Sequence, residues 1–301
     1  MGILIDENTT AIVQGITGRA GEAYTRYMRE YGTKVLAGVT PGRGGSMAAE
    51  LPVYDTVKEA VAKHGPIDAT VTFVPGPGLK DAVLEAIDAG IKMIVCPVER
   101  VPLHDIMVMV TTAKRQGVRL IGPGTIGLIT AGKAILGWVG SSAERAREVF
   151  TPGPVGILSR SGGQSGTLPY VIRKAGYGCS TLVHEGTEPI LGTSFGDLMP
   201  LYEADEQTKI IAMFGELGGT TEEEVAEEMK KGHYTKPLVA YIAGAWAPEG
   251  MRFSHASSIV EHGRGSAKSK IEALRSAGAI VVDRPAEIPT KVAEILKGMG
   301  Q

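Results

Sequence analysis

The chain has 301 residues, of which 43% are hydrophobic and 21% charged, and its formal net charge is -2. The composition is that of a folded globular protein, and the length exceeds what one hydrophobic core usually serves, so we expect two domains. The near-neutral charge excludes a protein that holds nucleic acid or a membrane surface through its overall charge. We therefore expect small molecules and protein as partners.

The first half of the chain alternates short β-branched runs with helical patterns. Residues 79–89 and 103–116 carry apolar side chains at helical spacing and are predicted helices. The predicted strands are residues 10–16, 34–39, 69–74, 92–96 and 118–121. Strand and helix in this order predict a parallel sheet with right-handed crossovers. The Gly or Pro turns after the strands mark the edge at which such sheets bind ligands.

The periodicity weakens from residue 127 to residue 154, where Gly and Pro accumulate. We place the domain boundary there, with a first domain at 1–130, a linker at 131–153 and a second domain at 154–301. The second domain has predicted helices at 222–231 and 266–277, and predicted strands at 155–158, 180–184, 209–214, 237–242 and 279–282. The predicted fold class is therefore α/β, with two doubly wound domains.

The N-terminus and the cysteines give information on the compartment. Residues 1–6 have no basic region followed by an apolar core, and no stretch reaches the roughly 18 apolar residues of a membrane span. A cytoplasmic protein is the expectation. Cys96 and Cys179 lack both CxxC and zinc-ligand spacing, so we expect two core thiols and no disulfide.

A glycine-containing turn after the first predicted strand predicts an anion site. Residues 14–21 read Gln-Gly-Ile-Thr-Gly-Arg-Ala-Gly and open a helix, a context in which backbone N–H groups face a phosphate. The spacing is G-x-x-G-x-x-G and differs from the dinucleotide fingerprint, so a purely structural turn is the alternative.

The end of the second predicted strand separates the candidate nucleotides. An NAD-binding domain needs an acid there for the ribose hydroxyls. Residues 38–45 contain no acid and one arginine, Arg43. A guanidinium fork suits an additional ribose phosphate, which favours CoA or NADP. A surface arginine in a flexible turn is the alternative.

A second turn, in the other domain, favours phosphoryl chemistry. Residues 156–163 read Gly-Ile-Leu-Ser-Arg-Ser-Gly-Gly after a predicted strand, and their hydroxyls and glycines suit a phosphate better than a plain helix cap. His255 lies among small residues, where its ring can attack a phosphoryl group, and Glu216 is the candidate carboxylate that fixes its tautomer. A bland polar histidine is the alternative. The other histidines lack metal-ligand spacing, so we assign no metal to this chain.

These segments resemble the alpha subunit of succinyl-CoA synthetase along almost the whole chain. The matching stretches are residues 14–18, 38–42, 84–92, 159–162, 215–219 and 241–244. The resemblance implies a Rossmann-like CoA-binding domain, a flavodoxin-like ligase domain and a beta subunit of ATP-grasp fold in a heterodimer or heterotetramer. It also implies that CoA is joined to a small carboxylic acid through an acyl phosphate and a phosphohistidine, with ATP or GTP and Mg²⁺ bound mainly by the beta subunit.

The resemblance implies roles for individual residues. His255 falls on the phosphorylated histidine and Glu216 on the glutamate that orients it. The phosphate-holding turn comprises Ser159, Ser161, Gly162 and Gly163. The CoA contacts fall on Thr17, Gly18, Arg19, Ala20, Arg43, Pro97, Val98 and Glu99. Arg43 replaces a lysine of the family, and of its Ile-Thr-Glu contact only Glu99 is kept.

The departures from the family gather around the acid substrate. Succinyl-CoA synthetases read Ser-Arg-Ser-Gly-Thr-Leu-Thr-Tyr where residues 159–166 read Ser-Arg-Ser-Gly-Gly-Gln-Ser-Gly. This loop and residues 122–127 resemble ATP-citrate lyase and citryl-CoA synthetase. Gln164, Ser165 and Gly166 are the predicted substrate residues, and Gly166 in place of tyrosine favours a larger or hydroxylated acid. Refilling of the space by neighbouring loops, with succinate kept, is the alternative.

A second departure concerns the loop at 184–189, which reads His-Glu-Gly-Thr-Glu-Pro in place of Gly-Ile-Gly-Gly-Asp-Pro.

The leading interpretation of the whole chain is that it is the alpha subunit of an acid–CoA ligase of the succinate type. A citrate-type or other non-succinate ligase subunit is the alternative within this class. The altered loop also leaves open a non-catalytic acyl-CoA-binding paralogue, against which the retained His255 and Glu216 argue. An NADP oxidoreductase is disfavoured because no acid–base pair accompanies the first turn.

Overall fold

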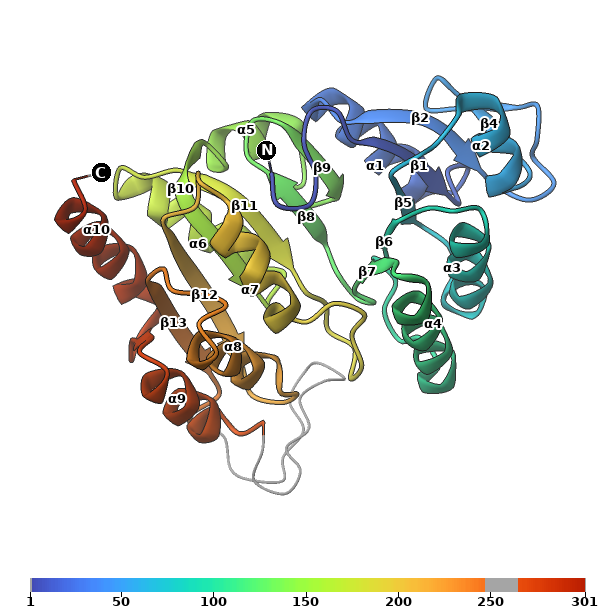
Figure 1. Cartoon of the computed structure of the whole chain (residues 1–301). Coiled ribbons are helices and arrows are strands. Elements are labelled where there is room, and N and C mark those ends of the chain that lie inside the picture. Colours follow the sequence, from blue (N-terminus) through green and yellow to red (C-terminus); the bar gives the residue numbers. More distant parts are fainter. Residues whose placement is uncertain (1, 247–264, 301) are drawn as a thin grey trace.

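The computed structural model describes residues 2–246 and 265–300, which form two α/β units, each around a seven-stranded sheet (Figure 1). The predicted α/β class is confirmed. His255 lies outside the described residues.

The first unit has a Rossmann-like strand order, β3-β4-β2-β1-β5-β6-β7. Its strands are β1 (Thr10–Gln14), β2 (Lys34–Val39), β3 (Met47–Ala48), β4 (Leu51–Tyr54), β5 (Ala69–Thr72), β6 (Met93–Val95) and β7 (Arg119–Ile121). Its helices are α1 (Arg19–Tyr31), α2 (Val57–His64), α3 (Leu79–Asp88) and α4 (Leu103–Gln116), with a short 3-10 turn η1 (Gly76–Gly78). Neighbouring strands are parallel except for the pair β3 and β4. The chain order reverses between β1 and β5, where open α/β sheets bind ligands.

The second unit has the order β14-β13-β12-β10-β11-β8-β9. Its strands are β8 (Gly127–Thr130), β9 (Ala134–Gly137), β10 (Pro152–Ser159), β11 (Cys179–His184), β12 (Ile210–Glu216), β13 (Leu238–Ala243) and β14 (Ile280–Val281). Its helices are α5 (Ala143–Val149), α6 (Gln164–Lys174), α7 (Phe195–Ala204), α8 (Thr221–Lys230), α9 (Ala267–Ser276) and α10 (Ile288–Gly298), with the 3-10 turn η2 (Pro285–Glu287). The strands from β14 to β11 run parallel in a flavodoxin-like order. The hairpin β8–β9 extends the sheet antiparallel to β11.

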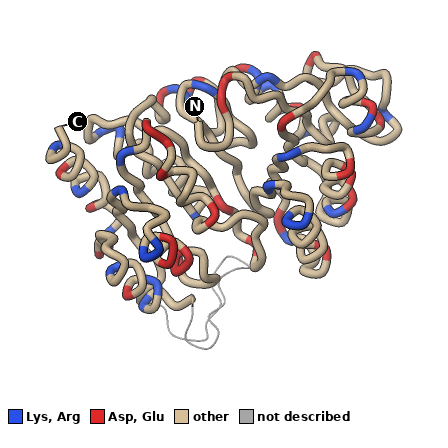
Figure 2. Tube along the Cα trace, in the orientation of Figure 1, with Lys and Arg blue, Asp and Glu red and all other residues tan. Residues whose placement is uncertain are grey.

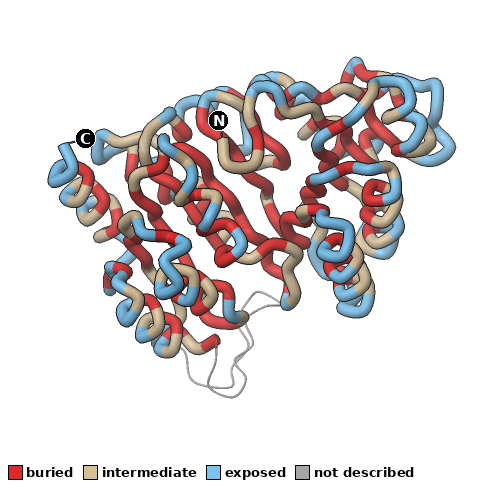
Figure 3. Tube along the Cα trace, in the orientation of Figure 1, coloured by how far each residue is buried: buried red, intermediate tan, exposed pale blue. Residues whose placement is uncertain are grey.

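The strands form because both faces of each sheet are covered. Every residue of β5 and β11 is buried, which explains why these segments read as nearly continuous apolar or β-branched runs (Figure 3). The helices bury only one face, and their outer faces are exposed in Figure 3. Figure 2 shows Lys, Arg, Asp and Glu interspersed over both units.

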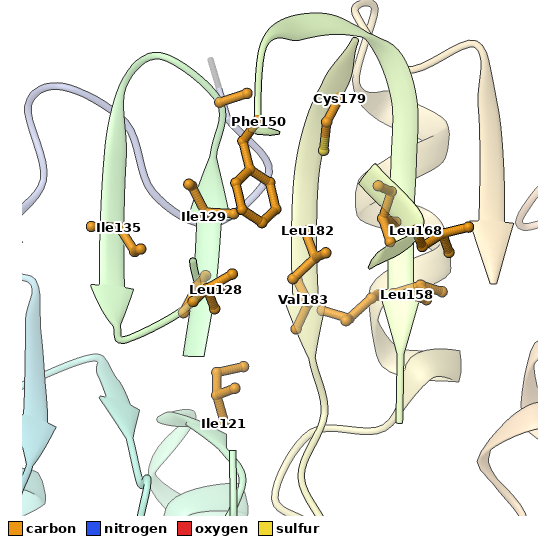
Figure 4. Packing of buried hydrophobic residues seen from close by; sticks show 14 of the residues in the cluster. Ile121, Leu128, Ile129, Ile135, Phe150, Leu158, Leu168, Cys179, Leu182 and Val183 are labelled. Carbon is orange, nitrogen blue, oxygen red and sulfur yellow. The ribbon is translucent and has the colours of Figure 1, made fainter. Parts of the chain in front are cut away.

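The two units share one hydrophobic cluster. Helix α1 of the first unit packs against β9 and α5, and the cluster continues through Leu128 and Ile129 to Leu158 and Leu182 (Figure 4). The Thr33 hydroxyl donates to the carbonyl of Ile135 at 2.7 Å, so the edge of β9 is covered by the first unit. This contact fixes the two units as neighbours.

Residues 127–153 contain more structure than their weak periodicity suggested. They hold the hairpin β8–β9, helix α5 and the start of β10, so the predicted linker at 131–153 is largely ordered into the second unit. The periodic pattern of apolar residues was weak because the hairpin is short and antiparallel, and because it begins and ends in glycine. The domain limits at 130 and 154 stay a prediction.

Both cysteines are buried and unpaired, as expected. Burial raises the pKa of Cys96 to about 12, and burial also raises the pKa of Cys179. The two thiols are therefore protonated core groups. Within the described ranges, no helix has the length and apolar character needed to cross a membrane.

Candidate functional site

A cavity of about 720 Å³ opens at the carboxyl edge of the first sheet. It lies between β1 and β5, at the reversal of chain order. The lining residues come from the ends of four strands and from helix α3: Gln14, Gly15, Thr17, Gly18, Val39, Thr40, Pro41, Asp55, Thr56, Phe73, Val74, Pro75, Gly78, Asp81, Ala82 and Glu85. The size and mostly apolar, backbone-rich wall suit a large nucleotide-containing ligand.

The glycine turn at the cavity is sterically required. Gly15 has φ +78°, and a Cβ on it would lie 2.3 Å from the carbonyl oxygen of Phe73. The N-cap of α1, Gly18, makes no side-chain cap hydrogen bond, so the first N–H groups of α1 are not capped by that residue. Thr17 and Gly18 line the cavity, and the exposed Arg19 and Ala20 begin α1. This is the geometry of an anion site at a helix N-terminus.

Arg43 lies in the turn that follows β2, two residues beyond the cavity wall at Pro41. Its backbone N–H donates to the carbonyl of Thr40 at 3.1 Å, and Thr40 and Pro41 line the cavity. The neighbouring N–H of Gly44 donates to Asp55 at 2.8 Å. Sequence reasoning missed Asp55, because β4 contains a proline and was not predicted as a strand. This carboxylate holds the turn that carries Arg43.

The loop after β6 contains the remaining predicted CoA residues, Pro97, Val98 and Glu99. These residues are not among those that line the cavity. The loop lies beside η1, because a Cβ on Gly76 would be 3.8 Å from Val98, and η1 continues into the cavity wall at Pro75 and Gly78. The predicted CoA residues therefore form two neighbouring groups along one edge of the sheet.

The second predicted turn lies between β10 and α6. The Ser159 hydroxyl donates to the carbonyl of Ser161 at 2.9 Å, and the N–H of Gln164 donates to the Ser161 hydroxyl at 3.4 Å. Gly162 and Gly163 complete the turn before the first residue of α6. The seryl hydroxyls thus shape the turn, and its backbone begins a helix, as an anion site requires.

A buried cluster of charges lies beside this turn, around Arg160. Its guanidinium is 3.8 Å from the carboxylates of Glu185 and Glu222 and 4.0 Å from that of Glu216. Burial alone would lower the pKa of Arg160, but Glu222, Glu185 and Glu216 outweigh it and raise that pKa. The Lys270 ammonium donates to Glu222 and to the carbonyls of residues 216 and 218.

This cluster positions Glu216. The N–H of Glu216 donates to Glu222 at 2.9 Å, and Lys270 binds the carbonyl of Glu216 at 2.8 Å. The Glu216 side chain remains 14% exposed, whereas those of Glu222 and Lys270 are fully buried. The predicted orienting carboxylate is therefore held at the carboxyl edge of β12, beside the Ser159–Gly163 turn. Sequence reasoning missed Glu222 and Lys270, which lie 48 residues apart and meet only in the fold.

A cavity of about 360 Å³ adjoins the first turn of α6. Its lining residues come from the segment before β8, the loop after β9, α5 with the residue after it, and α6 with the turn before it: Ile126, Trp138, Gly140, Ser141, Arg145, Val149, Phe150, Gly162, Gly163, Gly166, Thr167 and Tyr170. Of the predicted substrate residues, Gly166 lies in this wall. Gln164 does not, and Ser165 is fully buried with its hydroxyl bonded to the carbonyl of Ser161 at 2.9 Å.

Residues 184–188 of the altered loop are buried between the two units, and Pro189 is exposed. His184 accepts the N–H of Ile126 on Nδ1 at 3.0 Å and faces the carbonyl of Arg160 with Nε2 at 3.3 Å, a pattern that requires the proton on Nε2. Glu185 accepts hydrogen bonds from the Phe195 N–H and the Thr221 hydroxyl. Burial, partly offset by Arg160, raises the pKa of Glu185 to about 8.

Two family models match the chain. The model described as CoA binding domain matches residues 6–99, and that described as CoA-ligase matches residues 158–280. The succinate–CoA ligase [ADP-forming] subunit alpha 2 of Archaeoglobus fulgidus is 47% identical, over 98% of this chain and 100% of its own. The ADP-forming sulfoacetate-CoA ligase subunit SqwL of an Acholeplasma species is 44% identical, over 100% of this chain and 99% of its own.

Among solved structures, ATP citrate lyase from Methanothrix soehngenii, in complex with citrate and coenzyme A, is similar to this chain with a TM-score of 0.88 and 28% identity. The match covers 99% of this chain and 51% of that one, so the chain spans about half the length of the lyase. The similarity extends over both units and includes their arrangement.

Proposed function

Since this chain belongs to the family of succinate–CoA ligase alpha subunits, we propose that its two sheet edges carry out two halves of one ligation reaction. Membership confirms the predicted CoA-binding domain, the ligase domain and a beta subunit as partner. The finer points are part of the proposal: an ATP-grasp beta subunit, a heterodimer or heterotetramer, a cytoplasmic location and ATP as nucleotide. ATP is favoured over GTP because the relatives named above form ADP.

In this proposal the first edge binds CoA. The observation that carries it is the cavity of about 720 Å³ beside an α1 N-terminus that Gly18 leaves without a side-chain cap. The N–H groups of Thr17, Arg19 and Ala20 bind the diphosphate, while the N–H of Gly18 donates to the carbonyl of Gly15 at 3.1 Å and shapes the turn. Arg43, in the turn beyond Pro41, binds the ribose phosphate. The loop with Pro97, Val98 and Glu99 meets the thiol-bearing arm. When bound, CoA supplies the thiolate that attacks the activated acid.

The second edge transfers the phosphoryl group. The beta subunit passes the γ-phosphoryl group of ATP to His255, and the acid carboxylate then takes it to give an acyl phosphate. The CoA thiolate displaces phosphate from the acyl carbon, so the products are acyl-CoA, ADP and phosphate. Glu216 accepts the ring N–H of His255 and fixes its tautomer, and the Ser159–Gly163 turn holds the phosphoryl oxygens. The buried bonds of Glu216 to Glu222 and Lys270 support this role.

The acid substrate is proposed to enter the cavity beside α6. Arg145 is the one charged residue in the wall described above, so the cavity suits an acid with a second anionic group. A Cβ on Gly163 or Gly166 would meet nothing within 4 Å, so these glycines leave room for an acid larger than succinate. Gln164 and Ser165, predicted as substrate residues, contribute less here, because neither lies in the wall. Sulfoacetate, citrate and malate are candidates beside succinate.

Two experiments test the proposed function on the complex with the beta subunit. Intact-mass analysis at alkaline pH after incubation with Mg-ATP should show one phosphate on the wild-type chain and none on His255→Asn; equal labelling would place the phosphate elsewhere. For the acid, kcat/KM is compared for succinate, sulfoacetate, malate and citrate. A preference for succinate of more than about tenfold, or roughly 1.4 kcal/mol, would refute the enlarged cavity.

A further inference from the structure

The altered loop of the ligase unit contacts the CoA unit through three buried residues. Thr187 and Glu188 are 8% and 3% exposed. Gly186, at φ +128°, packs so closely that a Cβ would lie 2.3 Å from the carbonyl oxygen of Pro123. The loop is thus seated against the segment that connects the two units.

The polar atoms of this loop reach the loop after β6. The Thr187 hydroxyl lies 3.3 Å from a carboxylate oxygen of Glu99 and 3.4 Å from the carbonyl of Gly124, and it donates its proton to this pair. The Glu188 carboxylate accepts the backbone N–H of Arg100. Arg100 has φ +58°, a conformation that is costly for a residue with a side chain, so an external acceptor is needed to hold it.

We infer that Thr187 and Glu188 are positioning residues that hold Glu99 and its loop in the conformation that receives the thiol-bearing arm of CoA. This rests on the proposed CoA site. The succinate-family pattern has glycine at the position of Thr187, and glycine has no hydroxyl to offer Glu99. The altered loop therefore supplies a contact for CoA binding, and its departure from the family does not by itself indicate lost activity.

The inference predicts a specific pattern in CoA binding. In the complex with the beta subunit, Thr187→Val should raise the KM and Kd for CoA by about tenfold, the scale of one hydrogen bond to a charged group. Thr187→Ser keeps the hydroxyl and should stay near wild type. Glu188→Gln keeps an acceptor for the Arg100 N–H and should also stay near wild type, whereas Glu188→Ala should weaken CoA binding.

Two readouts separate positioning from a general structural role. The KM for the acid and the rate at which Mg-ATP phosphorylates the chain should not change in Thr187→Val, because neither involves CoA. As a matched control, Thr235→Val removes a hydroxyl that bonds Glu203 at 2.7 Å before β13 and should leave CoA binding unchanged. If Thr187→Val fails to fold, Thr187→Ser and the two Glu188 variants still give the test.

The failure of this inference differs from the failure of the CoA site. If Glu99→Gln and Arg43→Ala weaken CoA binding but Thr187→Val does not, the positioning role is refuted and the CoA site stands. The positioning role would also be refuted if Thr187→Val changed the KM for CoA, the KM for the acid and the rate of phosphorylation by the same factor. If neither Glu99→Gln nor Arg43→Ala weakens CoA binding, the proposed CoA site itself is wrong.

Discussion

The two sheets present similar carboxyl edges, yet the first surrounds one large cavity and the second carries a cluster of buried ionisable side chains. At the first edge, strand ends and the glycine turn surround a cavity of about 720 Å³. At the second edge, Arg160, Glu185, Glu222 and Lys270 are 1% exposed or less, and the cavities beside them are smaller, about 360 and 190 Å³. The same topology thus surrounds a large cavity in one unit and fixes buried side chains in the other.

The difference follows from what each edge has to hold. A bound nucleotide brings its own charges, so the first edge needs room, backbone N–H groups and an arginine in a neighbouring turn. Phosphoryl transfer needs side chains fixed in place before the reaction, and buried ion pairs fix them at a cost in desolvation. Breaking the buried charges should therefore reduce stability, whereas changing the first edge should reduce affinity.

Removal of a buried charge should give the largest effect. Lys270→Met removes the cation that binds the carbonyl of Glu216 and leaves Arg160, 3.8 Å away, as the remaining cation beside Glu222; it should lower the free energy of unfolding by about 3–5 kcal/mol. The control is Lys291→Met, which breaks an exposed pair with Glu294 and should cost about 0.5 kcal/mol. Denaturant unfolding measures both. Equal losses would show that the second edge is no more dependent on its charges than the surface.

At the first edge the expected effect is on affinity. Arg43→Ala removes one charge-assisted phosphate contact and should weaken CoA binding by about 1.5–3 kcal/mol, with little change in stability. Arg26→Ala, which breaks an exposed pair with Glu22 on α1, is the matched control and should leave the Kd unchanged. Calorimetry with CoA provides the measurement. The same Kd in both variants would remove Arg43 from the CoA site.

The buried titratable groups of the second edge should also make stability depend on pH. The pKa of Glu185 is raised to about 8, above its value in the unfolded chain, so the folded state holds this proton more tightly. Its contribution to stability is present at low pH and is lost as the pH rises through 8. Relative to Glu185→Gln, the wild-type protein should lose about 2 kcal/mol of unfolding free energy between pH 6 and pH 8. Parallel pH profiles of the two proteins would contradict this.

Short stretches of sequence predicted the helices and strands that have a regular spacing or an unbroken run of apolar residues. Strand β2 and helix α4 have the predicted bounds, because β2 is a run of mostly buried apolar residues and α4 has a regular apolar spacing. Strand β4 was missed because Pro52 interrupts it, and α7 because it contains Pro200. The hairpin β8–β9 depends on long-range pairing with β11, which leaves no periodic signal.

The same distinction applies to the candidate site. Thr17 and Gly18 were predicted because a turn that opens a helix is a continuous stretch of sequence. Glu222 and Lys270 were not, because their pairing exists only after β12, α8 and α9 pack together. Ser165 was predicted to face the substrate, but its place one residue before Gly166 on α6 turns it into the core.

The smallest expected effect tests whether Gly166, the glycine inside α6, is kept for function. Gly166 lies inside α6 with open space where a Cβ would be, so Gly166→Ala should stabilise the protein by about 0.5–1 kcal/mol through helix propensity and reduced freedom of the unfolded chain. Because the methyl group would enter the cavity beside Arg145, kcat/KM should fall for the larger acids and change least for succinate. The control is Gly176→Ala, which also has open space but sits at φ +95° and should destabilise. A Gly166→Ala protein with greater stability and an unchanged acid preference would show that the acid does not bind against this turn of α6.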